Sequence, residues 1–173
     1  MSELPYSKIP DYPEELHGAS ILIRLIDGLG FRYRWATEGL TADDLDFQPC
    51  DSSMDLKKLL YHVNSLVTWV QECLTGEERQ EKEFNSLEEI RIDTLNTALN
   101  IRKSLTETTD EELAELKCTA PWFKGTFPVW NLINGPISDA FTHVGQIASW
   151  RRINANPIPK ASVFWGTTPN TSQ

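Results

Sequence analysis

The stretch SDAFTHVGQI, residues 138–147, has the pattern of the middle of a long helix. Within it Asp139 and His143 are four residues apart, so their side chains leave the same helix face one turn from each other. A carboxylate and an imidazole at that spacing can bind one metal ion. Two ligands are too few for a firm site, so a third must come from elsewhere. The remaining histidines of the chain, His17 and His62, are the candidates.

Length and composition predict a single domain over residues 1–173, with a core at about 14–155 and a tail at 156–173. The chain has 40% hydrophobic and 24% charged residues, which is typical of a globular protein. Its formal net charge is −9, and its longest basic runs are the pairs at 57–58 and 151–152. This charge pattern argues against a nucleic-acid partner.

Neither a membrane span nor a secretory signal is visible in the sequence. The apolar runs are too short to cross a bilayer, and the first residues lack a basic region followed by an apolar one. The three cysteines, Cys50, Cys73 and Cys118, are an odd number without close spacing. We therefore expect no membrane partner, a cytoplasmic location and reduced thiols rather than a disulfide framework.

Four long segments carry apolar residues three or four positions apart, which predicts amphipathic helices. These segments are residues 14–38, 54–74, 87–106 and 129–154. Ser52 or Ser53 is the expected cap of the second helix, and Ser86 is the expected cap of the third. Pro136 is expected to kink or divide the last helix. Four such helices with little strand pattern predict an all-α four-helix bundle.

The connections between these helices are long. Residues 40–53 are expected to form a loop with one short turn at 41–45. Asp110 is expected to cap a short helix at 111–116, and the aromatic segment 118–127 to form an ordered loop or a short hairpin. The irregular tail is expected to pack through Val163, Phe164 and Trp165. Long connections leave room for crossovers, so the order of the helices in space stays open.

The metal-ligand hypothesis combines His62, Asp139 and His143. His62 lies beside the apolar stripe of the second helix, and zinc, nickel, iron and manganese all accept imidazole nitrogen. Three protein ligands with open positions are the pattern of catalytic metal sites. Each ligand histidine should also donate its other ring N–H to an acceptor. The neighbours available for that role are Asn64, Thr142 and Gln146.

A structural interpretation stands beside this hypothesis. A histidine beside an apolar stripe is often a hydrogen-bonded core residue, and an aspartate four residues before a histidine often forms only a helical pair. His17 is expected at the surface or as a cap, and Cys73 as a small core residue. The sequence has no Gly-x-Ser-x-Gly motif and no phosphate-binding glycine loop.

Two short motifs give the chain a family resemblance. With LYHV at residues 60–63, HVGQI at 143–147 and an arginine following at Arg151 or Arg152, the chain resembles the DinB-like / YfiT-like family of metalloenzymes over roughly residues 16–154. The resemblance implies a four-helix bundle, often a homodimer. It also implies a metal bound by one histidine of the second helix and a His-x-x-x-His pair on the last, which places ligands at His62 and His143. Asp139 stands where the family has the first histidine of the pair.

The resemblance also implies a function. Characterised relatives include thiol-dependent transferases and a maleylpyruvate isomerase, so it implies a divalent-metal-dependent transferase or hydrolase acting on a small molecule that the sequence does not identify. Nickel or zinc is expected first, then iron or manganese, with a low-molecular-weight thiol as a further cofactor. In the alternative the metal is lost, Asp139 merely bonds His143, and the metal-free bundle is a small-ligand-binding or protein-interaction module.

Overall fold

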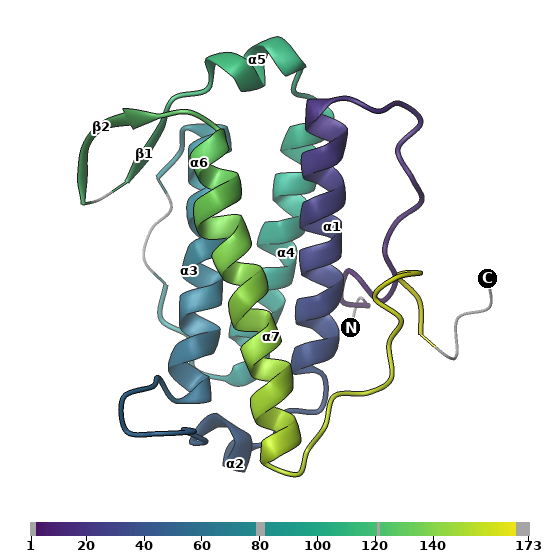
Figure 1. The fold of residues 1–173 in the computed structure, drawn as a ribbon, viewed down its shortest axis with the longest axis vertical. Helices are drawn as coiled ribbons and strands as arrows, with labels where there is room; N and C mark the ends of the chain where they lie inside the picture. Colours follow the sequence, from purple (N-terminus) through teal and green to yellow (C-terminus); the bar gives the residue numbers. More distant parts are fainter. Residues whose placement is uncertain (1–2, 79–81, 121, 169–173) are drawn as a thin grey trace.

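Four long helices form the body of the molecule (Figure 1). The computed structural model describes residues 3–78, 82–120 and 122–168. The helices are α1 (Gly18–Thr37), α3 (Leu56–Thr75), α4 (Leu87–Thr106) and α7 (Ser138–Ile153). Together they confirm the predicted all-α bundle. Within the described part of the chain, no helix combines the length and the apolar character that crossing a membrane requires.

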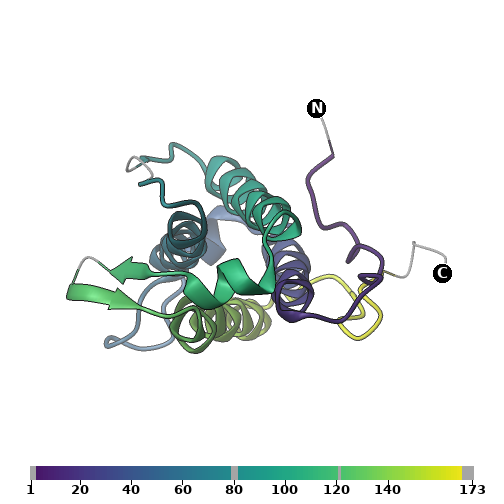
Figure 2. The same ribbon diagram turned by 90° about the horizontal axis from the view of Figure 1, so that it is seen from above.

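The four helices stand at the corners of a square (Figure 2). Both α1 and α3 pack against α4 and α7, so α1 lies diagonally opposite α3. In Figure 1, α1 and α7 run downward while α3 and α4 run upward. Because α3 and α4 are parallel neighbours, their connection must return along the length of the bundle. The order is therefore not a simple up-and-down one.

The core is formed by the apolar stripes of the four helices. Leu59, Leu60 and Val63 of α3 are almost completely buried, as the spacing of the second predicted helix requires. Ile26 of α1 and Ile147 of α7 face the same interior. Full burial of one such side chain contributes about 1.5–3 kcal/mol before the entropy of ordering it is counted. Packing of these stripes, more than helix propensity, therefore stabilises the bundle.

The helix ends were predicted unevenly. The third helix, α4, has the predicted bounds, and the Ser86 hydroxyl accepts the backbone N–H of Glu89 as its cap. The predicted cap of α3 is wrong. Asp55 caps this helix instead of Ser52 or Ser53, because its carboxylate accepts the backbone N–H of Lys58 at 2.7 Å.

The first helix begins four residues later than predicted. Residue Gly18, rather than Glu14, opens α1, and His17 is its cap. The Asp110 carboxylate, 92 residues later in the chain, accepts the backbone N–H groups of Gly18 and Ala19 at 3.0 and 3.1 Å. The first backbone N–H groups of a helix have no partner within the helix, and the Asp110 carboxylate accepts two of them here. This contact therefore fixes the start of α1 at Gly18.

The short elements follow the prediction with one correction. The expected turn at 41–45 is the short helix α2 (Ala42–Leu45). The second short helix, α5 (Asp110–Glu115), is capped by Thr109 and not by Asp110. Strands β1 (Cys118–Ala120) and β2 (Phe123–Phe127) form an antiparallel hairpin, which decides between the loop and the hairpin. Residue 121 lies outside the described residues.

The last helix is divided as Pro136 predicts. A short α6 (Trp130–Leu132) leads into a π-helical segment, Ile133–Ile137, and then into α7. Pro136 has no N–H to donate, and Gly135 before it has non-helical angles, φ −88° and ψ −108°. The Ser138 hydroxyl bonds the Ile133 carbonyl across this break. The kink separates the helix into a short upper part and the long α7.

The N-terminal arm, residues 3–12, and the tail lie together beside α1 (Figure 2). Tyr6 of the arm is buried against Gly30, where a Cβ atom would lie 2.6 Å from the tyrosine ring. The predicted tail packing is wrong, because Val163, Phe164 and Trp165 are all exposed. The tail is held instead by the Ile9 N–H, which donates to the Gly166 carbonyl. Residues 79–81, in the charged connection at 77–83 between α3 and α4, and residues 169–173 of the tail lie outside the described residues.

Candidate metal centre

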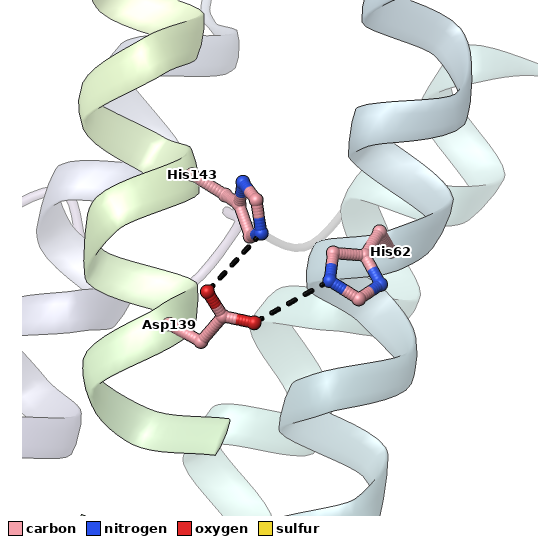
Figure 3. A group of neighbouring side chains, drawn as sticks. All are labelled: His62, Asp139 and His143. Atoms are coloured by element: carbon pink, nitrogen blue, oxygen red, sulfur yellow. Dashed lines mark ion pairs between the residues drawn. The ribbon is translucent and has the colours of Figure 1, made fainter. Parts of the chain in front are cut away.

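The three predicted ligands come together from two neighbouring antiparallel helices. Figure 3 shows His62 on α3 facing Asp139 and His143 on α7. Asp139 and His143 lie one turn apart on the same side of α7, as their spacing predicts. The fold therefore brings together all three residues of the ligand hypothesis. His17 lies at the start of α1 beside Asp110 and is not part of the cluster.

The Asp139 carboxylate lies between the two imidazoles. Its Oδ2 atom is 3.5 Å from Nε2 of His62, and its Oδ1 atom is 3.3 Å from Nε2 of His143. The two rings meet edge to face, with centroids 4.7 Å apart. Each residue offers one ligand atom, and these atoms all lie within 4.8 Å of one another.

These separations fit a metal-ligand set. Charge-assisted hydrogen bonds between imidazolium and carboxylate are about 2.7–2.9 Å long, so both contacts are longer than such a bond. Ligand atoms bound at about 2.0–2.2 Å to one ion are themselves about 2.8–3.1 Å apart in octahedral geometry and about 3.3–3.6 Å apart in tetrahedral geometry. The separations of 3.5 Å, to Oδ2 of Asp139, and 3.3 Å, to its Oδ1, fall in the tetrahedral range. The donor set of two imidazoles and one carboxylate also suits a borderline divalent ion.

Gln146 orients one of the rings. Its Oε1 atom lies 2.8 Å from Nδ1 of His143. An amide oxygen only accepts, so Nδ1 carries the hydrogen, and a neutral His143 presents its Nε2 lone pair to Asp139. A lone pair facing a carboxylate is favourable only with a proton or a cation between them. This arrangement resembles the outer hydrogen bond that metal-binding histidines usually make.

The other two predicted partners have different roles. The Asn64 amide donates to Asp93 and Thr94 at 2.9 Å in each case, between α3 and α4. The Thr142 hydroxyl donates to the Ser138 carbonyl of its own helix. Neither residue is bonded to the candidate ligands. Of the three neighbours, only Gln146 has the predicted contact.

The cluster is accessible from solvent. The side chains of His62 and Asp139 are 37% and 46% exposed, and that of His143 is 13% exposed. Structural metal sites are closed by four protein ligands, whereas this cluster has three and an open side. The arrangement can therefore accept a water molecule or a substrate group as a further ligand.

The arginine that completes the family resemblance lies outside the cluster. Arg151 is buried, and its guanidinium donates to the carbonyls of Ala36, Glu38 and Gly39 at the end of α1. Burial lowers the pKa of Arg151, because a guanidinium is less well solvated inside the protein. Its position gives it a role in joining α1 to α7. Arg152, the other candidate, is exposed.

Comparison with known proteins connects the fold to one family of structures. No protein-family model and no curated protein sequence matches the chain. The crystal structure of a DinB-like protein, YjoA from Bacillus subtilis, superposes with a TM-score of 0.60 and 14% sequence identity. The match covers 81% of this chain and 96% of that one. At this identity the likeness is one of fold, and the chain has the DinB-like four-helix-bundle fold.

Proposed function

We propose that this protein binds one divalent metal ion through His62, Asp139 and His143 and acts as a metal-dependent enzyme on a small molecule. The observation that carries the proposal is the position of the Asp139 carboxylate, 3.3 and 3.5 Å from the two imidazole Nε2 atoms. Nickel or zinc suits this donor set, and iron or manganese is also compatible with it.

The reaction class we propose is hydrolysis or a group transfer that depends on a thiol. A divalent ion bound at such a site supplies Lewis acidity and lowers the pKa of a bound water or thiol. Asp139 contributes a negative charge that offsets part of the charge of the ion. Gln146 fixes the orientation of the His143 ring. The exposed edge of the cluster admits the substrate and a low-molecular-weight thiol.

A second candidate function follows from the same distances. Both separations are within the range of an ion pair between a carboxylate and a protonated imidazole. In this alternative the cluster holds a proton in place of a metal, and the bundle is a ligand-binding or protein-interaction module. The two candidates differ in their affinity for divalent ions, which decides between them.

The test is a calorimetric titration of zinc and nickel into protein purified without a chelating tag. We expect near one ion per chain. His62→Ala and His143→Ala should each weaken binding at least about tenfold, because each removes one of three ligands. His17→Ala is the matched control and should bind like the wild type. Absence of binding, or equal weakening by His17→Ala, would exclude the proposed site.

A further inference from the structure

We propose that a surface of four aromatic side chains next to the metal centre binds the aromatic part of the substrate. The side chains are Trp69, Trp122, Phe123 and Phe127, and we call them the aromatic surface. The inference rests on the proposed function, because the polar head of the same substrate would reach His62, Asp139 and His143. It assigns a substrate class, namely small molecules with a metal-binding head and a flat aromatic body.

The aromatic surface follows the same face of α3 as the metal centre. His62 and Trp69 are seven residues apart, which is two helical turns and a rise of about 10 Å. Beside His62, helix α3 packs on α7, and toward its end α3 packs on β1. Trp69 is fixed there because its Nε1 atom donates to the Thr119 carbonyl at 2.8 Å. The ring therefore marks a defined position two turns from the metal ligands.

The hairpin adds the remaining aromatic rings. Trp122 meets Trp69 edge to face with centroids 4.9 Å apart, and Phe127 lies 6.0 Å from Trp69. Phe123 in turn lies 6.5 Å from Phe127. Figure 2 shows the hairpin extending outward on the side of the bundle formed by α3 and the α6–α7 helix. That side is the one whose helices carry the three candidate ligands.

Trp69 and Phe127 are partly buried against the core, and the other two rings are open to solvent. Trp122 is 75% exposed and Phe123 is 51% exposed. Single exposed apolar residues are common on protein surfaces, but neighbouring ones that form a patch are typical of a binding surface. Aromatic rings prefer edge-to-face or offset contact with another ring, and the cluster already has that geometry. A planar ligand group is therefore the occupant that these side chains fit.

The length of the substrate follows from the same geometry. The head must reach the metal centre while the body contacts Trp69 or Trp122, a span on the order of 10 Å along α3. A naphthalene ring joined directly to a chelating head group is about this long. A two-carbon molecule with the same head is too short to reach the aromatic surface.

The experiment compares two hydroxamates that share one metal-binding head. Acetohydroxamate and 2-naphthohydroxamate are titrated into the zinc-loaded protein, and their dissociation constants are compared. We expect 2-naphthohydroxamate to bind the wild type about tenfold more tightly, through added aromatic contact. Trp122→Ala should bring this ratio close to one and leave acetohydroxamate binding unchanged. Trp122 is an exposed hairpin residue, so its removal leaves the core intact.

Trp165→Ala is the matched control, because Trp165 is also an exposed tryptophan and belongs to the tail, which lies beside α1 on the other side of the bundle (Figure 2). It should keep the wild-type ratio. A ratio near one in the wild type, or a ratio unchanged in Trp122→Ala, would overturn the inference while the metal centre stands. If acetohydroxamate fails to bind, or binds His62→Ala equally well, the proposed function falls and the inference falls with it.

Discussion

At the scale of single residues, Asp139 distinguishes this chain from the pattern that it resembles. The family resemblance implies a histidine at this position, yet the carboxylate occupies the space between the two imidazoles. A carboxylate is a harder ligand than imidazole, so it disfavours a soft, copper-like ion. The spacing of Asp139 and His143 was sufficient to predict that they share a face of one helix.

The partner of His143 was less predictable. Three neighbours were available from the sequence, and only Gln146 contacts the ring. Asn64 points instead toward Asp93 and Thr94 of α4. The direction of an amide side chain depends on which helix lies opposite, and spacing along one helix does not contain that information.

A second residue-scale prediction concerns the two buried cysteines. The Cys118 thiol donates a hydrogen bond to the Cys73 sulfur, which lowers the pKa of Cys73 to about 7. The same bond, together with burial, raises the pKa of Cys118. We expect Cys118→Ala to raise the pKa of Cys73, because the thiolate loses its donor. The measurement is the ultraviolet absorbance of the thiolate against pH, with the exposed Cys50 replaced by serine.

If the ionisation of Cys73 kept its midpoint in Cys118→Ala, a different group would have to stabilise the thiolate. Hydrogen bonding by the Thr119 backbone and by the Trp69 side chain also lowers the pKa of Cys73, so these are the groups that would then take that role. Cys73 itself should remain buried in the variant, since its position at the end of α3 does not depend on Cys118.

At the scale of elements, Arg151 joins the ends of α1 and α7. It donates to carbonyls at the end of α1 that have no partner within the helix. We expect Arg151→Lys to lower the free energy of unfolding by about 2 kcal/mol. The ammonium group of lysine cannot donate to all the carbonyls that the planar guanidinium reaches. Urea denaturation measures this, and Arg152→Lys, its exposed neighbour, is the control. Equal stability of the two variants would show that the carbonyl contacts contribute little.

Hydrogen bonds to the Asp44 carboxylate also connect α2 to the end of α7. Burial opposes its ionisation, but hydrogen bonds from Thr41, Asn154 and Asn156 outweigh that effect and hold the pKa of Asp44 below its usual value. A lowered pKa adds stability that is complete above the unfolded value of about 3.9 and is lost as pH falls through the folded value.

We therefore expect Asp44→Asn to be less stable than the wild type at neutral pH. Its further loss of stability between about pH 5 and pH 2 should be smaller than that of the wild type, because the variant lacks a carboxyl group whose pKa is lowered in the folded state. Thermal unfolding at several pH values measures both effects. Parallel curves for the two proteins would mean that the pKa of Asp44 is the same in the folded and the unfolded state.

At the scale of the whole molecule, periodicity was sufficient to predict the four helices and the kink at Pro136. It was not sufficient to place them relative to one another, because the order depends on the long connections before α4 and after it. The start of α1 was mispredicted for a similar reason, since Asp110 reaches it from a distant segment. His62 and His143 face each other because α3 packs on α7. The pattern of residues along one helix does not determine which helix lies opposite it.

The tail shows the same limit. Its apolar residues suggested burial, but Gly166 and Ile9 make the contact instead, and a glycine in a positive-φ turn gives no hydrophobic signal.

The homodimer and the cytoplasmic location stay predictions. Light scattering of the purified protein tests the first of these. The DinB-like fold and the clustering of the three candidate ligands are the parts that the structure supports most directly.

The most direct test of the account is anomalous X-ray diffraction from crystals of the full chain grown with zinc. We expect one strong peak between α3 and α7. Nε2 of His62, Nε2 of His143 and a carboxylate oxygen of Asp139 should each lie about 2.0–2.2 Å from it. A crystal with no peak at this position, or with the ion bound by other residues while the His62 ring faces solvent, would contradict the account.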